Sequence, residues 1–128
     1  MVNLVKVSNF ITLYNARAKS INKLDENAII DIVIDLIKPI SYVSFDNKMK
    51  LIDKTIEDSK GAKYPTAERY KNFVVNLIAT YTNLEMTSKD YDALSECKLL
   101  NIVLSTFESE YVTCSKLIQL CLQDLESR

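Results

Sequence analysis

The chain has 128 residues, enough for one hydrophobic core, with hydrophobic and charged fractions (48% and 26%) typical of a globular domain. One glycine and two prolines are too few for the corners of a β architecture, so the sequence predicts a single all-α domain over residues 1–128. Sixteen basic and 17 acidic residues give a net charge of −1, which disfavours a general nucleic-acid binder.

The cysteines and the N-terminus indicate a cytoplasmic location. Cys114 and Cys121 lie seven residues apart on one expected helical face, about 10 Å by helix rise, which is too far for a disulfide. Three thiols, with Cys97 as the third, fit a reducing compartment. The first ten residues lack the apolar run of a signal peptide, and no window is apolar enough for a membrane span.

Two helices are expected in the first third of the chain. Residues 3–20 form an apolar stripe at helical spacing: Leu4, Val7, Ile11, Tyr14 and Ala18. Residues 25–38 are apolar apart from one narrow polar stripe, which consists of Asn27, Asp31 and Asp35. This pattern predicts a mostly buried second helix at the centre of the fold, ended by Pro39.

Two further helices flank the only glycine. Asp46 is expected to cap a third helix that continues to about residue 59. Residues 59–64 form the clearest loop and contain Gly61. Pro65 then opens a fourth helix to about residue 83, at the position where proline is best tolerated.

The last third carries a capping signal and an ambiguous break. Thr87 and Asp90 have the spacing of a capping box and predict the start of a fifth helix. Residues 105–109 interrupt the apolar pattern without Gly or Pro, so residues 88–127 form either two helices or one long kinked helix. The sequence thus predicts a single compact bundle of five to six helices.

Residues suited to catalysis or metal binding are scarce. Histidine is absent, the three cysteines lack metal-like spacing, and one glycine cannot build a phosphate-binding loop. The pair Asp31 and Asp35 is interpreted as a polar stripe facing solvent rather than a metal site. We therefore expect no catalytic residue, no metal, no cofactor and no enzyme activity.

A partner-binding surface is predicted in residues 42–70. Aromatic residues outside the helical stripes, together with nearby basic residues, resemble interface hot spots. The predicted set is Tyr42, Phe45, Lys48, Lys50, Lys63, Tyr64 and Arg69. In the alternative interpretation, Phe45 packs at the start of the third helix while Tyr42 and Tyr64 cover the edge of the core.

Two segments carry a resemblance to other proteins: YVSFDNKMKLIDKTIEDS and YPTAERYKNFVVNLIATYTNLEMT. Together with the acidic C-terminal part, they resemble small uncharacterised helical proteins of phages and prophages of low-GC Gram-positive bacteria, over roughly residues 40–128. The resemblance implies a phage origin, an accessory or virion-assembly role, and a place in the host cytoplasm or in the particle. It implies no site residues.

Three functions are weighed on these grounds. The leading hypothesis is a non-enzymatic interaction module that acts as a virion-assembly or minor connector component, as a homo-oligomer or on a larger phage or host protein. The alternative is a phage-encoded inhibitor of a host defence complex. The third is a small DNA-binding accessory protein that uses the basic segment 38–71, which holds eight basic and five acidic residues. A carboxylate–metal enzyme comes last.

Overall fold

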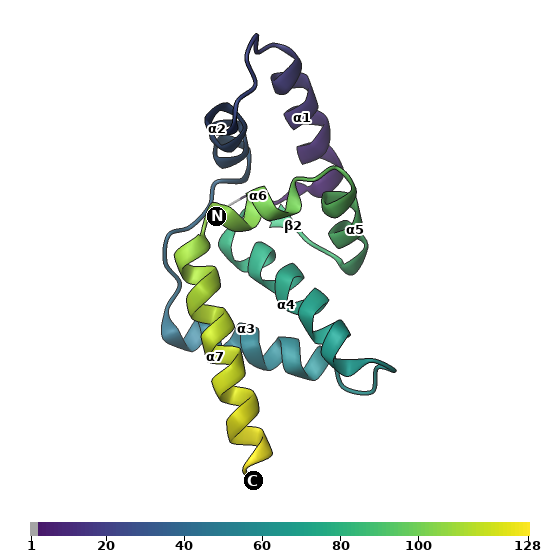
Figure 1. The fold of residues 1–128 in the computed structure, drawn as a ribbon, viewed down its shortest axis with the longest axis vertical. Helices are drawn as coiled ribbons and strands as arrows, with labels where there is room; N and C mark the ends of the chain where they lie inside the picture. The colour runs from purple at the N-terminus through teal and green to yellow at the C-terminus, as the bar shows by residue number, and fades with distance from the viewer. Residues whose placement is uncertain (1–2) are drawn as a thin grey trace.

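The computed structural model describes residues 3–128 and is mostly helical, which confirms the all-α prediction in outline. The described residues form seven helices, not five or six, and α1 and α2 lie at the opposite end of the molecule from α3 and the C-terminus of α7 (Figure 1). The elements are β1 (Val5–Lys6), α1 (Val7–Lys19), α2 (Glu26–Ile37), α3 (Phe45–Asp58), α4 (Pro65–Tyr81), β2 (Leu84–Glu85), α5 (Ser88–Glu96), α6 (Leu100–Ser105) and α7 (Glu108–Glu126).

The helix starts follow local capping chemistry. Pro65 occupies the first turn of α4, as predicted. Thr87 and Asp90 form the predicted capping box, in which the Asp90 carboxylate accepts from the Thr87 backbone N–H at 2.9 Å. The predicted cap of α3 is wrong by two residues: Ser44, not Asp46, accepts from the Asn47 N–H, so Phe45 already belongs to the helix.

The extra helix arises because the chain turns at Lys98. Lys98 adopts a left-handed conformation with φ of 65°, and the Leu99 N–H donates to the Leu94 carbonyl at 3.0 Å. This is a Schellman-type helix end with lysine in place of the usual glycine. A second break at Thr106 and Phe107 falls inside the predicted interval, so residues 88–127 contain three helices.

The centre of the core is α4, which corrects the prediction for the second helix. Residues 73–78 of α4 are all buried, as is Tyr81. In α2 only Ile32, Val33 and Ile37 are buried, and Ile34 is 41% exposed. An apolar pattern shows how much surface a helix can bury, but the number of neighbours is set by the tertiary arrangement. Here α2 packs against α1 and α6 at one end of the molecule (Figure 1).

The segment that follows α4 joins three parts of the chain. The parallel pair of β1 and β2, which was not predicted, places Val5 opposite Leu84. The Ile40 N–H donates to the Tyr81 carbonyl, and the Asn83 N–H donates to the Ile37 carbonyl. Residues 81–85 therefore hold β1 and the end of α2 against the central helix.

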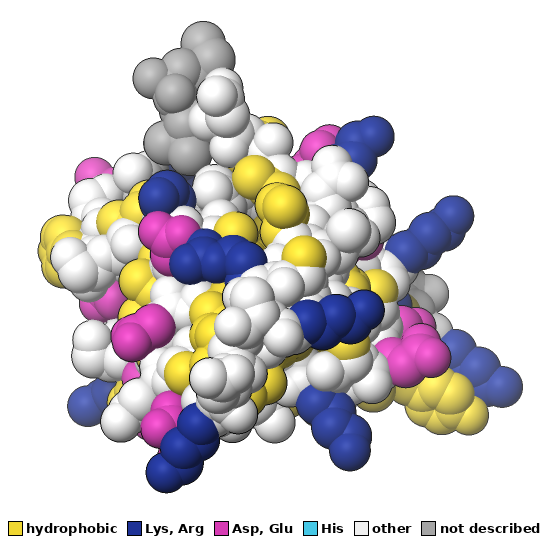
Figure 2. Space-filling view, turned by 90° about the horizontal axis from the view of Figure 1, so that it is seen from above, with side chains coloured by type: hydrophobic (Ala, Val, Ile, Leu, Met, Phe, Trp, Pro, Cys, Tyr) yellow, Lys and Arg dark blue, Asp and Glu magenta, His cyan; other side chains and the backbone are white. Residues whose placement is uncertain are grey.

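The surface carries mixed charge. Seen from the α1–α2 end, basic side chains project singly between apolar and acidic atoms and form no continuous basic area on that face (Figure 2). Asp31 and Asp35 are exposed, as expected, and Arg17 pairs with Asp35, which lowers the pKa of that carboxyl. Within residues 3–128, no helix combines the length and apolarity needed to cross a bilayer.

The capping box yields a stability prediction. Thr87→Ala is expected to lower the free energy of unfolding by about 1 kcal/mol, because the start of α5 loses a side-chain partner. Urea denaturation followed by circular dichroism measures the loss. The neighbouring Ser88→Ala, at an exposed first-turn position, is the control and is expected to change stability by less than about 0.5 kcal/mol. Equal losses in the two variants would show that the box contributes nothing.

Candidate functional site

A buried ion pair joins α3 to α7. The Lys48 ammonium lies 3.0 Å from Glu110 Oε1, and the two residues are only 5% and 7% exposed. The prediction that Lys48 belongs to a partner-facing surface is therefore wrong. Its charge is held inside the protein because Glu110 on a distant part of the chain supplies the counter-ion.

The Glu110 carboxylate holds three partners on one oxygen. Its Oε1 also accepts from the Val43 N–H at 3.1 Å and from the Tyr81 hydroxyl at 3.0 Å. Burial by itself would raise the pKa of Glu110, but the hydrogen bonds from Lys48, Val43 and Tyr81 outweigh it and hold the pKa below its usual value. Glu110 thus stays ionised in the interior at neutral pH.

Two more titratable groups complete this polar cluster. The Tyr81 hydroxyl lies 3.6 Å from the Cys114 sulfur, and the Tyr81 ring stacks on Phe107 at 5.0 Å. Burial, followed by the contact with Cys114, raises the pKa of Tyr81 far above its usual range, and burial also raises the pKa of the Cys114 thiol. Tyr81 and Cys114 have no exposed surface, so both side chains face only the protein interior.

The predicted partner-binding residues fall on two separate surfaces. Tyr42 and Phe45, 64% and 58% exposed, lie at the start of α3, where the Lys48 ammonium sits 4.3 Å from the centre of the Tyr42 ring. Lys63 and Tyr64 follow the end of α3, which is 14 residues and therefore about 20 Å long. Lys50 is exposed on α3 between the two ends. The single patch expected from sequence is not formed.

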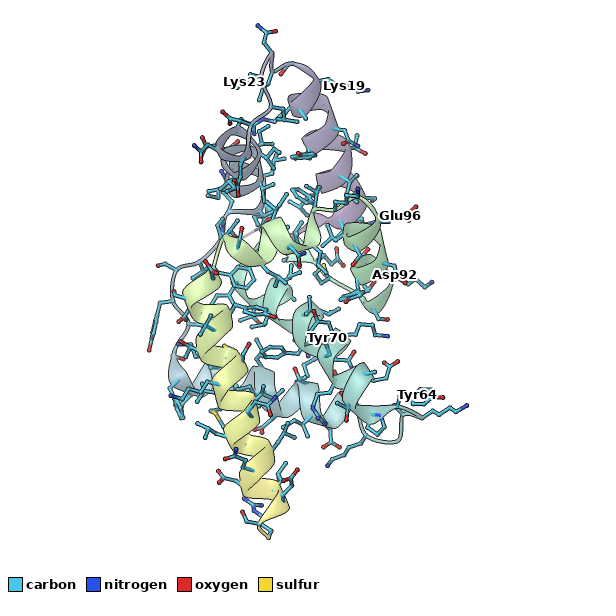
Figure 3. The ribbon with its side chains drawn as sticks, viewed as in Figure 1. Lys19, Lys23, Tyr64, Tyr70, Asp92 and Glu96 are labelled. Atoms are coloured by element: carbon cyan, nitrogen blue, oxygen red, sulfur yellow. The ribbon has the colours of Figure 1, made fainter. Side chains whose placement is uncertain are left out.

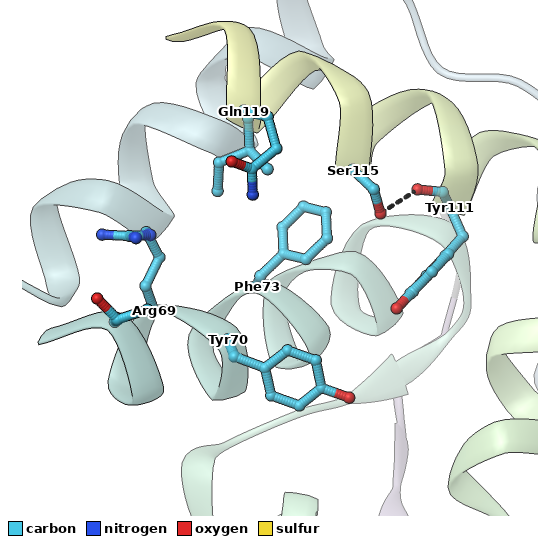
Figure 4. Close-up of a pocket in the computed structure, with 8 residues that line it drawn as sticks. Arg69, Tyr70, Phe73, Tyr111, Ser115 and Gln119 are labelled. Carbon is cyan, nitrogen blue, oxygen red and sulfur yellow. Dashed lines mark hydrogen bonds between the residues drawn. The ribbon is translucent and has the colours of Figure 1, made fainter. Parts of the chain in front are cut away.

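A hollow of about 260 Å³ lies between α4 and α7 and includes one predicted residue, Arg69 (Figure 4). The ring of Phe73 stands at its centre; Arg69 and Gln119 lie toward one end and Tyr111 toward the other. Its lining residues are Thr66, Arg69, Tyr70, Phe73, Tyr111, Ser115, Ile118 and Gln119. We call it the α4–α7 hollow.

A more open depression adjoins this hollow at the start of α4. It shares Thr66 and Tyr70 with the hollow, and Tyr64 and Tyr70 both project from this end of α4 (Figure 3). Its lining residues are Lys63, Tyr64, Pro65, Thr66, Ala67 and Tyr70. The hollow and the depression together are named the α4–α7 surface below.

The charged side chains that line the α4–α7 surface are basic. Its charged lining residues are Lys63 and Arg69, and among the described residues no carboxylate lines either depression. Glu68, which is adjacent in sequence, lines another depression and pairs with Lys71 at 3.2 Å. The α4–α7 surface is therefore aromatic with a basic edge.

Sequence reasoning found part of this surface. Tyr64, Lys63 and Arg69 were predicted because aromatic and basic residues cluster outside the helical stripes. Tyr70, which is 54% exposed, was not among the predicted residues. Tyr111 and Gln119 of α7 were missed because a stripe on one helix does not show how closely another helix covers it. The available signal was a tyrosine in the first turns of each of the two helices, Tyr70 in α4 and Tyr111 in α7.

Comparisons with protein-family models, curated proteins and solved structures find no match. Over residues 3–128, the Cys, Asp and Glu side chains form no group of three suited to holding a metal ion. The candidate site is therefore defined by its own geometry.

The ion pair yields a second stability prediction. Lys48→Met is expected to lower the free energy of unfolding by about 3–5 kcal/mol, because Glu110 stays buried without its cation. Adding Glu110→Gln should recover part of this loss, since a neutral amide oxygen can still accept from Val43 and Tyr81. Urea denaturation measures both, with exposed Lys50→Met as the control. A double variant no more stable than Lys48→Met would contradict the assignment.

The pH dependence follows from the lowered pKa of Glu110. Because the folded-state pKa lies below the unfolded one, this group's contribution is complete above the unfolded pKa and is lost as pH falls through the folded pKa. Between about pH 5 and pH 3, Glu110→Gln should therefore lose less stability than the wild type. Glu96→Gln, at an exposed position that takes part in no ion pair among the described residues, should follow the wild-type slope. Parallel slopes for all three proteins would refute the role of Glu110.

Proposed function

We propose that this chain is a non-enzymatic protein-interaction module that binds its partner through the α4–α7 surface. The observation that carries the proposal is the continuity of exposed aromatic side chains with the α4–α7 hollow, beside basic groups that have no acidic partner. Tyr64 and Tyr70 are 66% and 54% exposed, and neither Lys63 nor Arg69 lies within 4 Å of a described carboxylate.

Composition and rigidity both favour a protein partner. Tyrosine and arginine are enriched among residues that dominate binding energy, because each gives large contact area together with a polar end. The hollow is formed by side chains on two helices, and both helices contribute to the Glu110 cluster through Tyr81 and Glu110 itself. A surface held in this way loses little conformational entropy on binding.

The charge arrangement favours this proposal over the DNA-binding alternative. Phosphate binding requires free basic groups. Five of the eight basic residues of segment 38–71 are engaged with carboxylates, namely Lys38, Lys48, Lys54, Lys60 and Lys71. Only Lys50, Lys63 and Arg69 remain, which is a small footprint for a nucleic acid.

The biological setting of the proposal comes from the sequence resemblance. Small helical proteins of phages suggest a role in virion assembly or as a minor connector component, in the host cytoplasm or in the particle. Assembly components dock on larger proteins or on their own copies through helix faces. The α4–α7 surface is a helix-bounded surface of this kind.

Binding is tested by variants on the α4–α7 surface, with controls near the start of α3. Tyr64→Ala and Arg69→Glu are expected to abolish capture of the partner when tagged chains are recovered from producing cells and bound proteins are identified by mass spectrometry. Truncating such a residue typically costs about 2 kcal/mol or more, roughly a thirtyfold loss of affinity. The affinity is then measured with the purified partner.

The matched controls are Tyr42→Ala and Phe45→Ala, equally exposed aromatics at the far end of α3. They are expected to leave capture intact. If they abolish capture while Tyr64→Ala and Arg69→Glu do not, the α4–α7 surface is the wrong site. If none of the four variants changes the captured proteins, the interaction function assigned to these residues is refuted.

A further inference from the structure

The apolar stripe of α7 continues beyond the helices that cover it. Cys114 and Ile118 are buried, but Leu125, seven residues after Ile118 on the same stripe, is 47% exposed. Figure 1 shows the reason, since the last turns of α7 project past α3 and α4 toward the C-terminus. The exposed end of the stripe lies on a helix with 19 residues and so is not a frayed short element.

This exposed end is continuous with the α4–α7 hollow. Ile118 lines the hollow, and Leu122, one turn later, is half-buried. Gln119 forms part of the α7 wall, and Glu126 is seven residues further along the same side of the helix. A partner that covers the hollow and extends along α7 toward the C-terminus would therefore contact Leu122, Leu125 and Glu126.

The two parts of this strip have opposite charges. The α4 side carries Lys63 and Arg69, and the last turn of α7 carries Asp124 and Glu126, with Arg128 beyond the end of the helix. In the part of the chain that the structure describes, none of these five residues takes part in an ion pair. Each copy thus has a basic aromatic surface and, beside it, an acidic apolar helix end that would complement it.

We propose that the α4–α7 surface binds a second copy of this chain, with the last turns of the two α7 helices antiparallel across a two-fold axis. This inference rests on the proposed function, because it names the occupant of the same surface. If the two-fold axis passes between residues 122 and 123, Glu126 of the second copy lies level with Gln119 of the first. Gln119 lies toward the same end of the hollow as Arg69 (Figure 4). Leu125 of the second copy then lies over Ile118 and Leu122.

Two-fold symmetry makes this occupant fit better than an unrelated helix. In such a dimer every contact occurs twice, so the Arg69–Glu126 attraction and the burial of Leu125 are both doubled. The arrangement covers the exposed part of the apolar stripe on both copies at once. It also places the acidic end of one α7 on the basic edge of the other, which favours the antiparallel orientation over the parallel one.

The test is a charge exchange monitored by light scattering and sedimentation equilibrium. The wild type is expected at twice the mass of one chain. Arg69→Glu and Glu126→Arg, tested singly, should each weaken dimerisation about tenfold or more, because each places like charges opposite one another at two sites. The double variant Arg69→Glu with Glu126→Arg should return the dissociation constant to within about threefold of wild type.

Two further variants test whether the position of the charge and the burial of Leu125 matter for dimerisation. Lys116→Glu makes the same charge change as Arg69→Glu on the outer side of α7 and is expected to leave the mass unchanged. Leu125→Asn is expected to produce monomers that remain folded, as judged by circular dichroism, because Leu125 is 47% exposed within its own copy and is not part of the buried core.

The outcomes separate this inference from the proposed function. A wild type that stays monomeric at about 100 µM, or a dimer that the double variant fails to restore, overturns the second copy as occupant. If a monomeric wild type still captures another protein and Arg69→Glu abolishes that capture, the interaction function stands and only its occupant was wrong. A restored double variant supports the dimer.

Discussion

The arrangement of α3, α4 and α7 depends on one carboxylate. Glu110 accepts hydrogen bonds from Lys48 of α3, from the backbone of Val43 in the preceding connection and from Tyr81 of α4. A buried carboxylate that lost any of these partners would face a large desolvation cost, so arrangements in which the three segments do not meet at this point are strongly disfavoured. This requirement sets the position of α7 against α4, and that position defines the α4–α7 hollow.

Tyr81 links this cluster to the other end of the molecule. Its hydroxyl donates to Glu110, its ring stacks on Phe107, and its backbone carbonyl accepts from the Ile40 N–H. Two residues later, Asn83 pairs its backbone with Val5 and Ile37. The end of α4 is therefore the place where the α1–α2 part and the α3–α7 part share one core, which is continuous from Val7 to Ile118. A substitution at Tyr81 would therefore disturb the packing at both ends of the molecule.

The sequence predicted most of what depends on neighbouring residues in the chain, with the α3 cap and the turn at Lys98 as exceptions, and missed what depends on distant ones. The capping box at Thr87 and Asp90 was predictable because its groups lie within one turn. The sequence around Lys48 and Glu110 carried no such signal. In the pattern of its own helix each looks like an ordinary exposed charged residue, and the two become partners only because α3 packs against α7. The left-handed turn at Lys98 was missed because glycine, its usual marker, is absent. The same limit misplaced the centre of the core, since α2 is apolar but has few neighbours.

The division between buried and exposed charge explains why the candidate site lies where it does. A buried ion pair adds little net stability compared with apolar packing, but it penalises every arrangement that separates its partners and so fixes geometry. Five of the eight basic residues in segment 38–71 are paired with carboxylates, one of them in the interior. Of the three that remain, Lys63 and Arg69 line the same surface as the aromatic rings of Tyr70 and Phe73. Unpaired charge and exposed aromatic area thus coincide on a rigid surface. Where both coincide, a partner gains apolar burial and charge pairing without reorganising the helices that it meets.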